Sequence, residues 1–137
     1  MNASAAPKPI PEVTPALAPF FAAAREHRLL VQRCAGCGGL RFPPRELCST
    51  CLATDATWVE VSGRGEIYSY NVMHRVYHPG FAADVPYAVV IVKLAEGPKI
   101  TSSIVDCPVE EIRIGMPVVA VFEEITPEVT LPKFRRA

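Results

Sequence analysis

The sequence predicts a small, mainly β protein in which an N-terminal helix precedes a zinc ribbon and a C-terminal OB-fold barrel. Two observations carry this prediction. Four of the five cysteines stand in two Cys-x-x-Cys pairs separated by ten residues. Short apolar runs with glycine bends then recur over about 70 residues, which is typical of a small barrel, and the five-stranded OB-fold fits best. With 137 residues, half of them hydrophobic, the chain supports one compact domain, or a small core plus an appendage.

The N-terminal part of the chain is predicted to be a tail followed by a helix. Residues 1–15 form a flexible tail, because four prolines there disfavour regular structure. The helix covers residues 16–28, with Thr14 as its N-cap. Apolar residues recur at helical spacing on one face and include the adjacent Phe20 and Phe21. Such a face needs a surface to pack on, either this protein's own core or a partner.

The two cysteine pairs predict a structural metal site in a zinc ribbon that spans residues 29–57. One Cys-x-x-Cys turn brings two sulfurs to a metal ion, and a second turn completes a tetrahedral four-thiolate site. Because four thiolates leave no open position for a substrate, we expect a structural zinc and not a catalytic metal. Iron suits the same ligands, and the cysteines could instead form two disulfides or remain four free thiols. The predicted ligands are Cys34, Cys37, Cys48 and Cys51.

The OB-fold barrel is predicted over residues 58–126, and residues 127–137 are predicted to be a C-terminal tail. The barrel region begins with a β segment at Trp58 and then bends at Gly63 and Gly65. Alternating or continuous apolar runs indicate the strands that follow. These strands are 67–73, 87–94, 100–105 and 117–125.

Six short motifs occur in a specific order along the chain. They are LVQRCAGCG at 30–38, FPPR at 42–45, CSTC at 48–51, VSGRG at 61–65, PY at 86–87 and IGMPV at 114–118. Over about residues 17–126 the chain thereby resembles the zinc-ribbon plus OB-fold proteins first catalogued as domain of unknown function 35. The resemblance implies an N-terminal helix or helical hairpin, a rubredoxin-like zinc ribbon and a C-terminal OB barrel. Where many relatives carry a glycine after the helix, this chain has His27 and Arg28.

The resemblance also implies an accessory subunit of acyl-CoA enzymes of lipid metabolism, with a thiolase-fold or MaoC-like partner in a hetero-oligomer. Two regions are candidates for such contacts. The long loop 75–86 carries aromatic rings, which often anchor interfaces, although it can equally fold over a barrel mouth. Five arginines around the ribbon can pair with the phosphates of coenzyme A, meet a partner's acidic residues, or form a solvated face. The predicted acyl-CoA or partner contacts are Phe20, Phe21, Arg41, Phe42, Arg45, Tyr77, His78 and Phe81.

We therefore expect a non-catalytic subunit that docks on a thiolase-fold condensing, thiolase or aldolase-type enzyme and helps form or guard its acyl-CoA site. No nucleophile motif and no isolated carboxylate pair indicates catalysis. A single-stranded nucleic-acid-binding OB protein and a free-standing acyl-CoA-binding protein are the rival hypotheses. Tyr68 and Tyr70, spaced to share one strand face, favour nucleic acid. A formal net charge of zero and an acidic excess in 58–126 oppose it.

Location and membrane association are also constrained by the sequence. The N-terminal residues lack the charged region and long apolar run of a signal peptide. No stretch approaches the roughly 18 apolar residues that a membrane-spanning helix requires. The chain is thus expected to be cytoplasmic, without a membrane association, and its thiols are expected to stay reduced.

Overall fold

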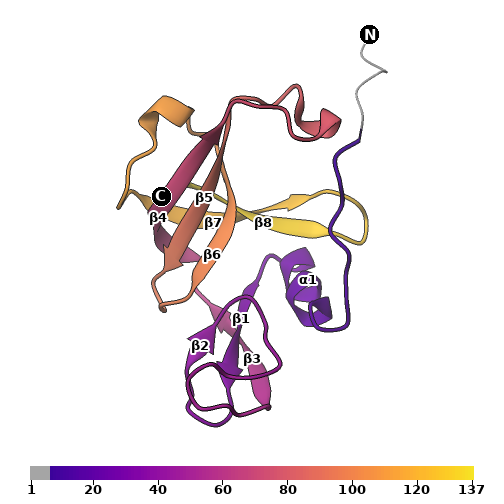
Figure 1. Cartoon of the computed structure of the whole chain (residues 1–137), viewed down its shortest axis with the longest axis vertical. Helices are drawn as coiled ribbons and strands as arrows, with labels where there is room; N and C mark the ends of the chain where they lie inside the picture. The colour runs from indigo at the N-terminus through magenta and orange to yellow at the C-terminus, as the bar shows by residue number, and fades with distance from the viewer. Residues whose placement is uncertain (1–6) are drawn as a thin grey trace.

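The computed structural model describes residues 7–137, and residues 1–6 of the predicted tail lie outside the described part. A short helix and a three-stranded sheet lie beside a closed five-stranded barrel (Figure 1). The mainly β architecture, with a helix, a ribbon and an OB-fold barrel in this order, is confirmed. Residues 7–14 have no regular secondary structure. None of the helices in the described part is long and apolar enough to cross a membrane.

Helix α1 spans Ala18–Arg25 and is therefore shorter than predicted. Residues before it form a turn, in which the Leu17 N–H donates to the Thr14 carbonyl oxygen at 3.0 Å. Leu17 occupies the N-cap position, so the prediction of Thr14 as N-cap is wrong. The later start places Pro19 in the first turn, where its missing N–H would have had no helical partner.

The helix ends in a Schellman motif. The N–H of Arg28 donates to the Ala23 carbonyl oxygen at 2.9 Å, and the N–H of His27 donates to the Ala24 carbonyl oxygen at 2.9 Å. This motif requires a left-handed residue, normally glycine, and His27 has a φ of 60°. His27, which stands where many relatives carry a glycine, therefore occupies the left-handed position of this motif, where glycine is normally found. The His27 ring stacks on Phe122 with 5.3 Å between ring centroids.

The ribbon sheet consists of β1 (Leu29–Cys34), β2 (Leu40–Arg41) and β3 (Ala56–Val61), in the antiparallel order β2-β1-β3. Strand β3 pairs with β1 along its whole length, from Leu29 opposite Val61 to Cys34 opposite Ala56. Residues 58–61 thus belong to the ribbon sheet, although the sequence pattern assigned them to the barrel. The chain bends at Gly63, whose φ is 81°, before it enters the barrel.

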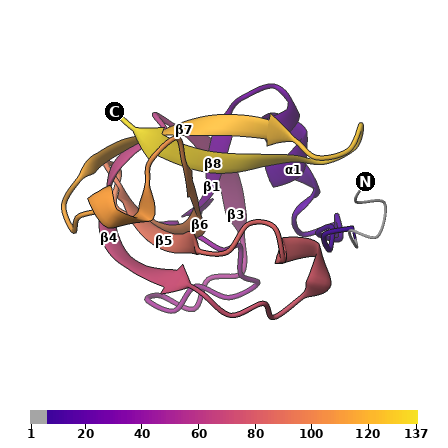
Figure 2. The same ribbon diagram turned by 90° about the horizontal axis from the view of Figure 1, so that it is seen from above.

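The barrel closes in the order β4-β5-β6-β8-β7, with β7 returning to pair with β4 (Figure 2). This is a closed five-stranded OB-fold. Two short 3-10 turns, η1 (Pro79–Phe81) and η2 (Val109–Glu111), lie in the connections. The strands are β4 (Arg64–Met73), β5 (Tyr87–Leu94), β6 (Lys99–Val105), β7 (Pro117–Glu124) and β8 (Thr130–Arg136).

Strand β8 corrects the prediction of a C-terminal tail. Residues from Thr130 to Phe134 alternate between buried and half-buried, which is the period of a strand with one face in a core. Phe134 is fully buried, and β8 pairs with β7 in antiparallel fashion and with β6 in parallel. Because β3 is used by the ribbon, β8 supplies the fifth strand. Pro132, which lacks an N–H, lies where β6 and β8 are not paired, and Ser102 Oγ donates to its carbonyl oxygen at 2.8 Å.

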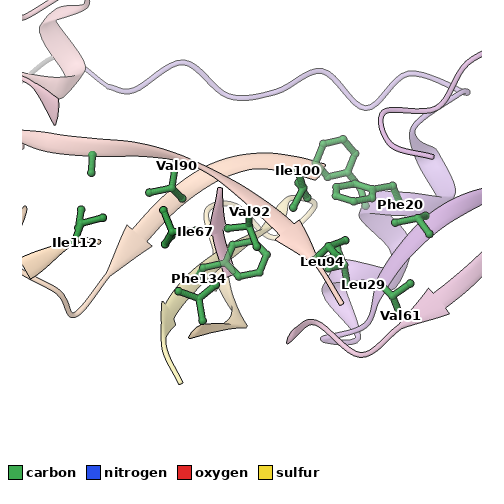
Figure 3. Close-up of a cluster of buried hydrophobic side chains, with 14 of the residues drawn as sticks. Phe20, Leu29, Val61, Ile67, Val90, Val92, Leu94, Ile100, Ile112 and Phe134 are labelled. Carbon is green, nitrogen blue, oxygen red and sulfur yellow. The ribbon is translucent and has the colours of Figure 1, made fainter. Parts of the chain in front are cut away.

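One continuous core joins the helix, the ribbon sheet and the barrel. Phe20 and Phe21 are each only 6% exposed, and both belong to the same cluster as Leu29 of the ribbon and Phe134 of the barrel. Figure 3 shows Phe20 beside Ile100 of β6. The helix therefore packs on this chain's own core, and the prediction that Phe20 and Phe21 are contact residues for a partner is wrong for this conformation.

Candidate metal centre and contact surfaces

The four predicted ligands come together in one metal site. Their sulfur atoms all lie within 4.8 Å of one another. Cys34 Sγ lies 3.5 Å from Cys51 Sγ, and Cys37 Sγ lies 3.8 Å from Cys48 Sγ. A tetrahedral zinc with Zn–S distances of about 2.3 Å holds its sulfurs about 3.8 Å apart. The described arrangement therefore fits a four-thiolate metal ion. Two ligands are buried and two are exposed, so the site lies at the surface of the ribbon.

Backbone N–H groups favour the thiolate form at the two buried sulfurs. The N–H groups of Cys37 and Gly36 point at Cys34 Sγ and lower the pKa of that thiol. The N–H groups of Cys51 and Thr50 do the same for Cys48 and lower its pKa to about 6. Metals bind the thiolate. These turns therefore shift both sulfurs toward the thiolate form that binds metal.

The fourth sulfur shows why a cation is needed. The Ala53 N–H lowers the pKa of Cys51, but the Cys34 sulfur, burial, and then the Cys48 and Cys37 sulfurs together outweigh it and raise that pKa to about 11. Four close negative sulfurs repel one another, and a bound divalent ion removes this repulsion. The chemistry of the donor set is therefore that of a closed structural metal site.

Two of the five ribbon arginines are used inside the chain. Arg41 Nε donates to Gln32 Oε1 at 2.9 Å, and its Nη2 donates to the Arg45 carbonyl oxygen at 3.0 Å. Arg28 pairs with Glu26 Oε1 at 2.7 Å. Arg41 thus has a structural role, because its guanidinium ties the segment between the two cysteine turns to β1; its predicted contact role stays a prediction. The Arg45 side chain remains exposed. Phe42 is half-buried and lies 5.0 Å from Phe20 between ring centroids.

Loop 75–86 buries part of its own aromatic surface. His78 Nδ1 accepts the N–H of Gly80 at 2.9 Å and so caps η1. The Phe81 ring is half-buried and stacks on Tyr87 of β5 with centroids 5.5 Å apart. Tyr77 remains 67% exposed, with the Arg75 guanidinium 5.2 Å from its ring centroid. Of the three predicted contact residues in the loop, Tyr77 is the one that presents most of its ring to solvent.

Tyr68 and Tyr70, predicted to share one face of a strand, lie on opposite faces of β4. The register shifts between Ile67 and Ser69, so Tyr68 is an extra residue in a β-bulge. Tyr70 is paired with the fully buried Val90 and packs against the core, whereas Tyr68 is 50% exposed. The prediction is wrong because the bulge interrupts the period-2 alternation. The two rings do not form a shared stacking platform.

The histidines in the described part of the chain form no catalytic pair with a serine or a cysteine. Within residues 7–137, no histidine side chain is hydrogen-bonded to a serine or cysteine side chain. His74 is exposed, and His78 is used as a cap. Cys107, the fifth cysteine, donates to the Pro108 carbonyl oxygen at 3.5 Å. One ion pair was not predicted from the sequence. Lys8, which was assigned to the flexible tail, has its Nζ 2.6 Å from Asp84 Oδ2. No local pattern signals a contact between residues so far apart.

The fold and the metal site define the class of protein: a rubredoxin-like zinc ribbon followed by an OB-fold barrel. Family models described as the rubredoxin-like zinc ribbon domain and the C-terminal OB-fold domain of ChsH2 match residues 21–56 and 58–123. The chain is 43% identical over 98 residues to a DUF35 domain-containing scaffold protein of Methanocaldococcus jannaschii, covering 71% of this chain and 69% of the relative. This protein belongs to the DUF35 family of ChsH2-type zinc-ribbon and OB-fold proteins, as the motifs indicated.

Two further similarities come from larger assemblies. The chain is 43% identical over 130 residues to a probable enoyl-CoA hydratase alpha subunit of Thermomonospora curvata; the match covers 95% of this chain but 40% of that protein. The chain thus spans less than half the length of this relative. A solved structure described as the Ltp2-ChsH2(DUF35) aldolase has a chain that is 42% identical, with a TM-score of 0.83. That match covers 93% of this chain and 98% of the other.

Proposed function

We propose that this protein is a non-catalytic accessory subunit that docks on a thiolase-fold acyl-CoA enzyme and helps form or guard its acyl-CoA site in a cytoplasmic hetero-oligomer. The observation that carries the proposal is the likeness to the DUF35 chain of the Ltp2-ChsH2(DUF35) aldolase, over nearly the whole of both chains. The likeness covers the helix, the ribbon and the barrel together. This chain therefore has the structural elements that it would need to play the part of that chain in a similar assembly.

The names of other relatives support a role beside an enzyme of CoA thioesters. One is the hydratase alpha subunit of Thermomonospora curvata. Another is the 3-oxo-4,17-pregnadiene-20-carboxyl-CoA hydratase alpha subunit of Mycobacterium tuberculosis, 32% identical over 103 residues and also much longer than this chain, which covers 32% of it. We favour an aldolase-type, thiolase-fold partner over a MaoC-like hydratase, because the chain of the aldolase matches this one end to end.

The described side chains are consistent with a subunit that does not catalyse on its own. Within residues 7–137, the exposed His74 and the capping His78 are hydrogen-bonded to no nucleophile that they could activate. The four cysteines of the ribbon leave a bound metal without an open position. We propose that the metal is zinc and that it holds the ribbon in the shape that the partner recognises.

Co-purification tests this function directly. The tagged protein is expressed from its own chromosome, and untagged proteins that co-elute are identified by mass spectrometry. We expect a thiolase-fold enzyme in a fixed ratio, with acyl-CoA turnover by the complex and none by this chain alone. Turnover of an acyl-CoA by the pure chain would contradict the proposal. A stable monomer that binds coenzyme A in calorimetry, with no co-eluting enzyme, would instead support a free-standing acyl-CoA-binding protein.

A further inference from the structure

The extended N-terminal segment contacts the loop between β4 and β5. Lys8 Nζ lies 2.6 Å from Asp84 Oδ2 and 5.5 Å from the centre of the Phe81 ring. The backbone is close as well: a Cβ added to Gly80 would lie 2.7 Å from both Lys8 Cα and the Pro7 carbonyl oxygen. Three contacts thus join residues 7–8 to one short part of the loop, which lies beside the N-terminal segment in Figures 1 and 2.

The part of the loop under Lys8 is also its most structured part. The Phe81 N–H donates to the His78 carbonyl oxygen at 2.9 Å, and the Asp84 N–H donates to the Phe81 carbonyl oxygen at 2.9 Å. The Phe81 ring rests on Tyr87 of β5. Lys8 therefore lies over a ring that is also stacked on the barrel. Its ammonium bridges this ring and a carboxylate three residues further on.

Each contact alone is modest, because the Lys8 and Asp84 side chains are 50% and 39% exposed and surface ion pairs contribute little. Their combination is more specific. A cation over a ring and an ion pair on the same ammonium restrict it to one place, and Gly80 allows the backbones to touch. A long loop has many alternative conformations. Contacts from a second segment exclude most of them.

We propose that residues 7–8 act as a strap that holds the 75–86 loop in one conformation, with Lys8 as the positioning residue for the loop's exposed Tyr77. The positioning role of Lys8 rests on the proposed function, because that role assumes that Tyr77 contacts the acyl-CoA enzyme partner. A loop that is already ordered binds without the entropic cost of ordering it. The strap thus increases partner affinity although Lys8 need not touch the partner.

Hydrogen exchange of the isolated chain tests the strap without any partner. Lys8→Met keeps most of the aliphatic stem and removes the charge, and Gly80→Ala pushes the strap away while leaving Lys8 intact. We expect both changes to accelerate exchange of the amides of residues 80–84 about tenfold. Lys133→Met is the matched control, because it removes an ion pair of the same 2.6 Å length, to Glu123 on the β7–β8 pair, and should leave those amides unchanged. Unchanged loop exchange in both test variants would overturn the strap.

A charge swap and a partner measurement complete the test. Asp84→Lys alone should accelerate loop exchange, and Lys8→Glu combined with Asp84→Lys should restore protection; failure of the swap to restore any protection would count against the ion pair. With the co-purified enzyme, Lys8→Met should weaken affinity about threefold to tenfold, and Lys133→Met should not. Faster loop exchange with unaltered affinity would overturn the positioning role. If the unchanged chain bound no acyl-CoA enzyme, the proposed function would fail, while the exchange data would still decide the strap.

Discussion

The N–H of Leu52 donates to the Cys48 carbonyl oxygen at 2.9 Å, just as the N–H of Gly38 donates to the Cys34 carbonyl oxygen at 2.9 Å. The two cysteine turns therefore follow the same backbone path, which places the residue after the second cysteine in the left-handed region. Gly38 has a φ of 76° and Leu52 a φ of 66°. A leucine in this conformation carries about 1–2 kcal/mol of strain. Its side chain is 67% exposed, so packing within this chain offsets little of that energy.

Leu52→Gly should consequently stabilise the protein. The relieved strain exceeds the extra conformational entropy that glycine adds to the unfolded chain, and we expect a net gain of about 0.5–1 kcal/mol. Chemical denaturation of the metal-loaded protein measures this change in the free energy of unfolding. Leu47→Gly is the control, because Leu47 is also exposed on this ribbon but has no left-handed backbone. That change should destabilise the protein. A loss of stability in Leu52→Gly equal to that of the control would contradict the strain argument.

The metal site predicts a dependence of the whole fold on the ligand cysteines. We expect one zinc per chain by elemental analysis and a colourless protein; an iron–thiolate absorption spectrum would contradict zinc. Cys37→Ser should lose the metal and lower the unfolding midpoint of the whole protein in one transition. The reason is that Leu29 and Val31 of the ribbon share a single core with the barrel. Cys107→Ser, outside the site, should keep the metal and lose much less stability, because Cys107 only partly packs against the core.

Sequence predicted best what depends on short spacing. The Cys34 and Cys48 turns are local motifs, and the strand at 87–94 is apolar at every position except the exposed Lys93. The misses depend on partners distant in sequence. Strand β8 was missed because it contains Pro132 and charged residues after it. Its burial depends on pairing with β6 and β7. The bulge at Tyr68 is visible only when β4 is paired with β5. Likewise, Lys8 has a role only because the barrel brings Asp84 beside it.

Buried and exposed rings should respond differently to substitution. Phe20→Ala opens a cavity beside Phe21 and Phe42 and should cost about 3–5 kcal/mol of folding free energy. Phe20→Asp with Phe21→Asp should therefore prevent folding, so any loss of partner binding in that variant would report unfolding. Tyr77→Ala should leave the unfolding midpoint unchanged and weaken partner binding by about 1–3 kcal/mol. Thermal unfolding and binding titrations on the same samples separate the two classes. A folded Phe20→Asp, Phe21→Asp protein would refute the assignment of these rings to the core.

Nucleic-acid binding should be weak. Strand β8 adds three basic residues to the barrel, Lys133, Arg135 and Arg136, so the acidic excess predicted for 58–126 nearly disappears. What remains against binding is a formal net charge of zero and the separation of Tyr68 from Tyr70 by the bulge. We expect no saturation at micromolar protein in fluorescence anisotropy with short single strands at physiological salt. Tight binding that falls steeply with added salt, as counterion release requires, would favour a nucleic-acid-binding function.

The C-terminal segment should be indispensable for folding. Deleting residues 130–137 removes β8 and leaves β6 and β7 with open edges where the barrel closes. It also removes Phe134, which is fully buried. Phe134→Ala isolates the second effect and should cost about 3–5 kcal/mol, measured by denaturant unfolding. Arg135→Ala is the control, since Arg135 is exposed on the same strand and, among the described residues, its side chain donates only to the carbonyl oxygen of Arg136. A truncated chain that keeps the cooperative unfolding of the full-length protein would show that residues 130–137 are a tail after all. The structure predicts instead that the truncation yields insoluble or unfolded protein, because a five-stranded barrel cannot exclude water from its core with four strands.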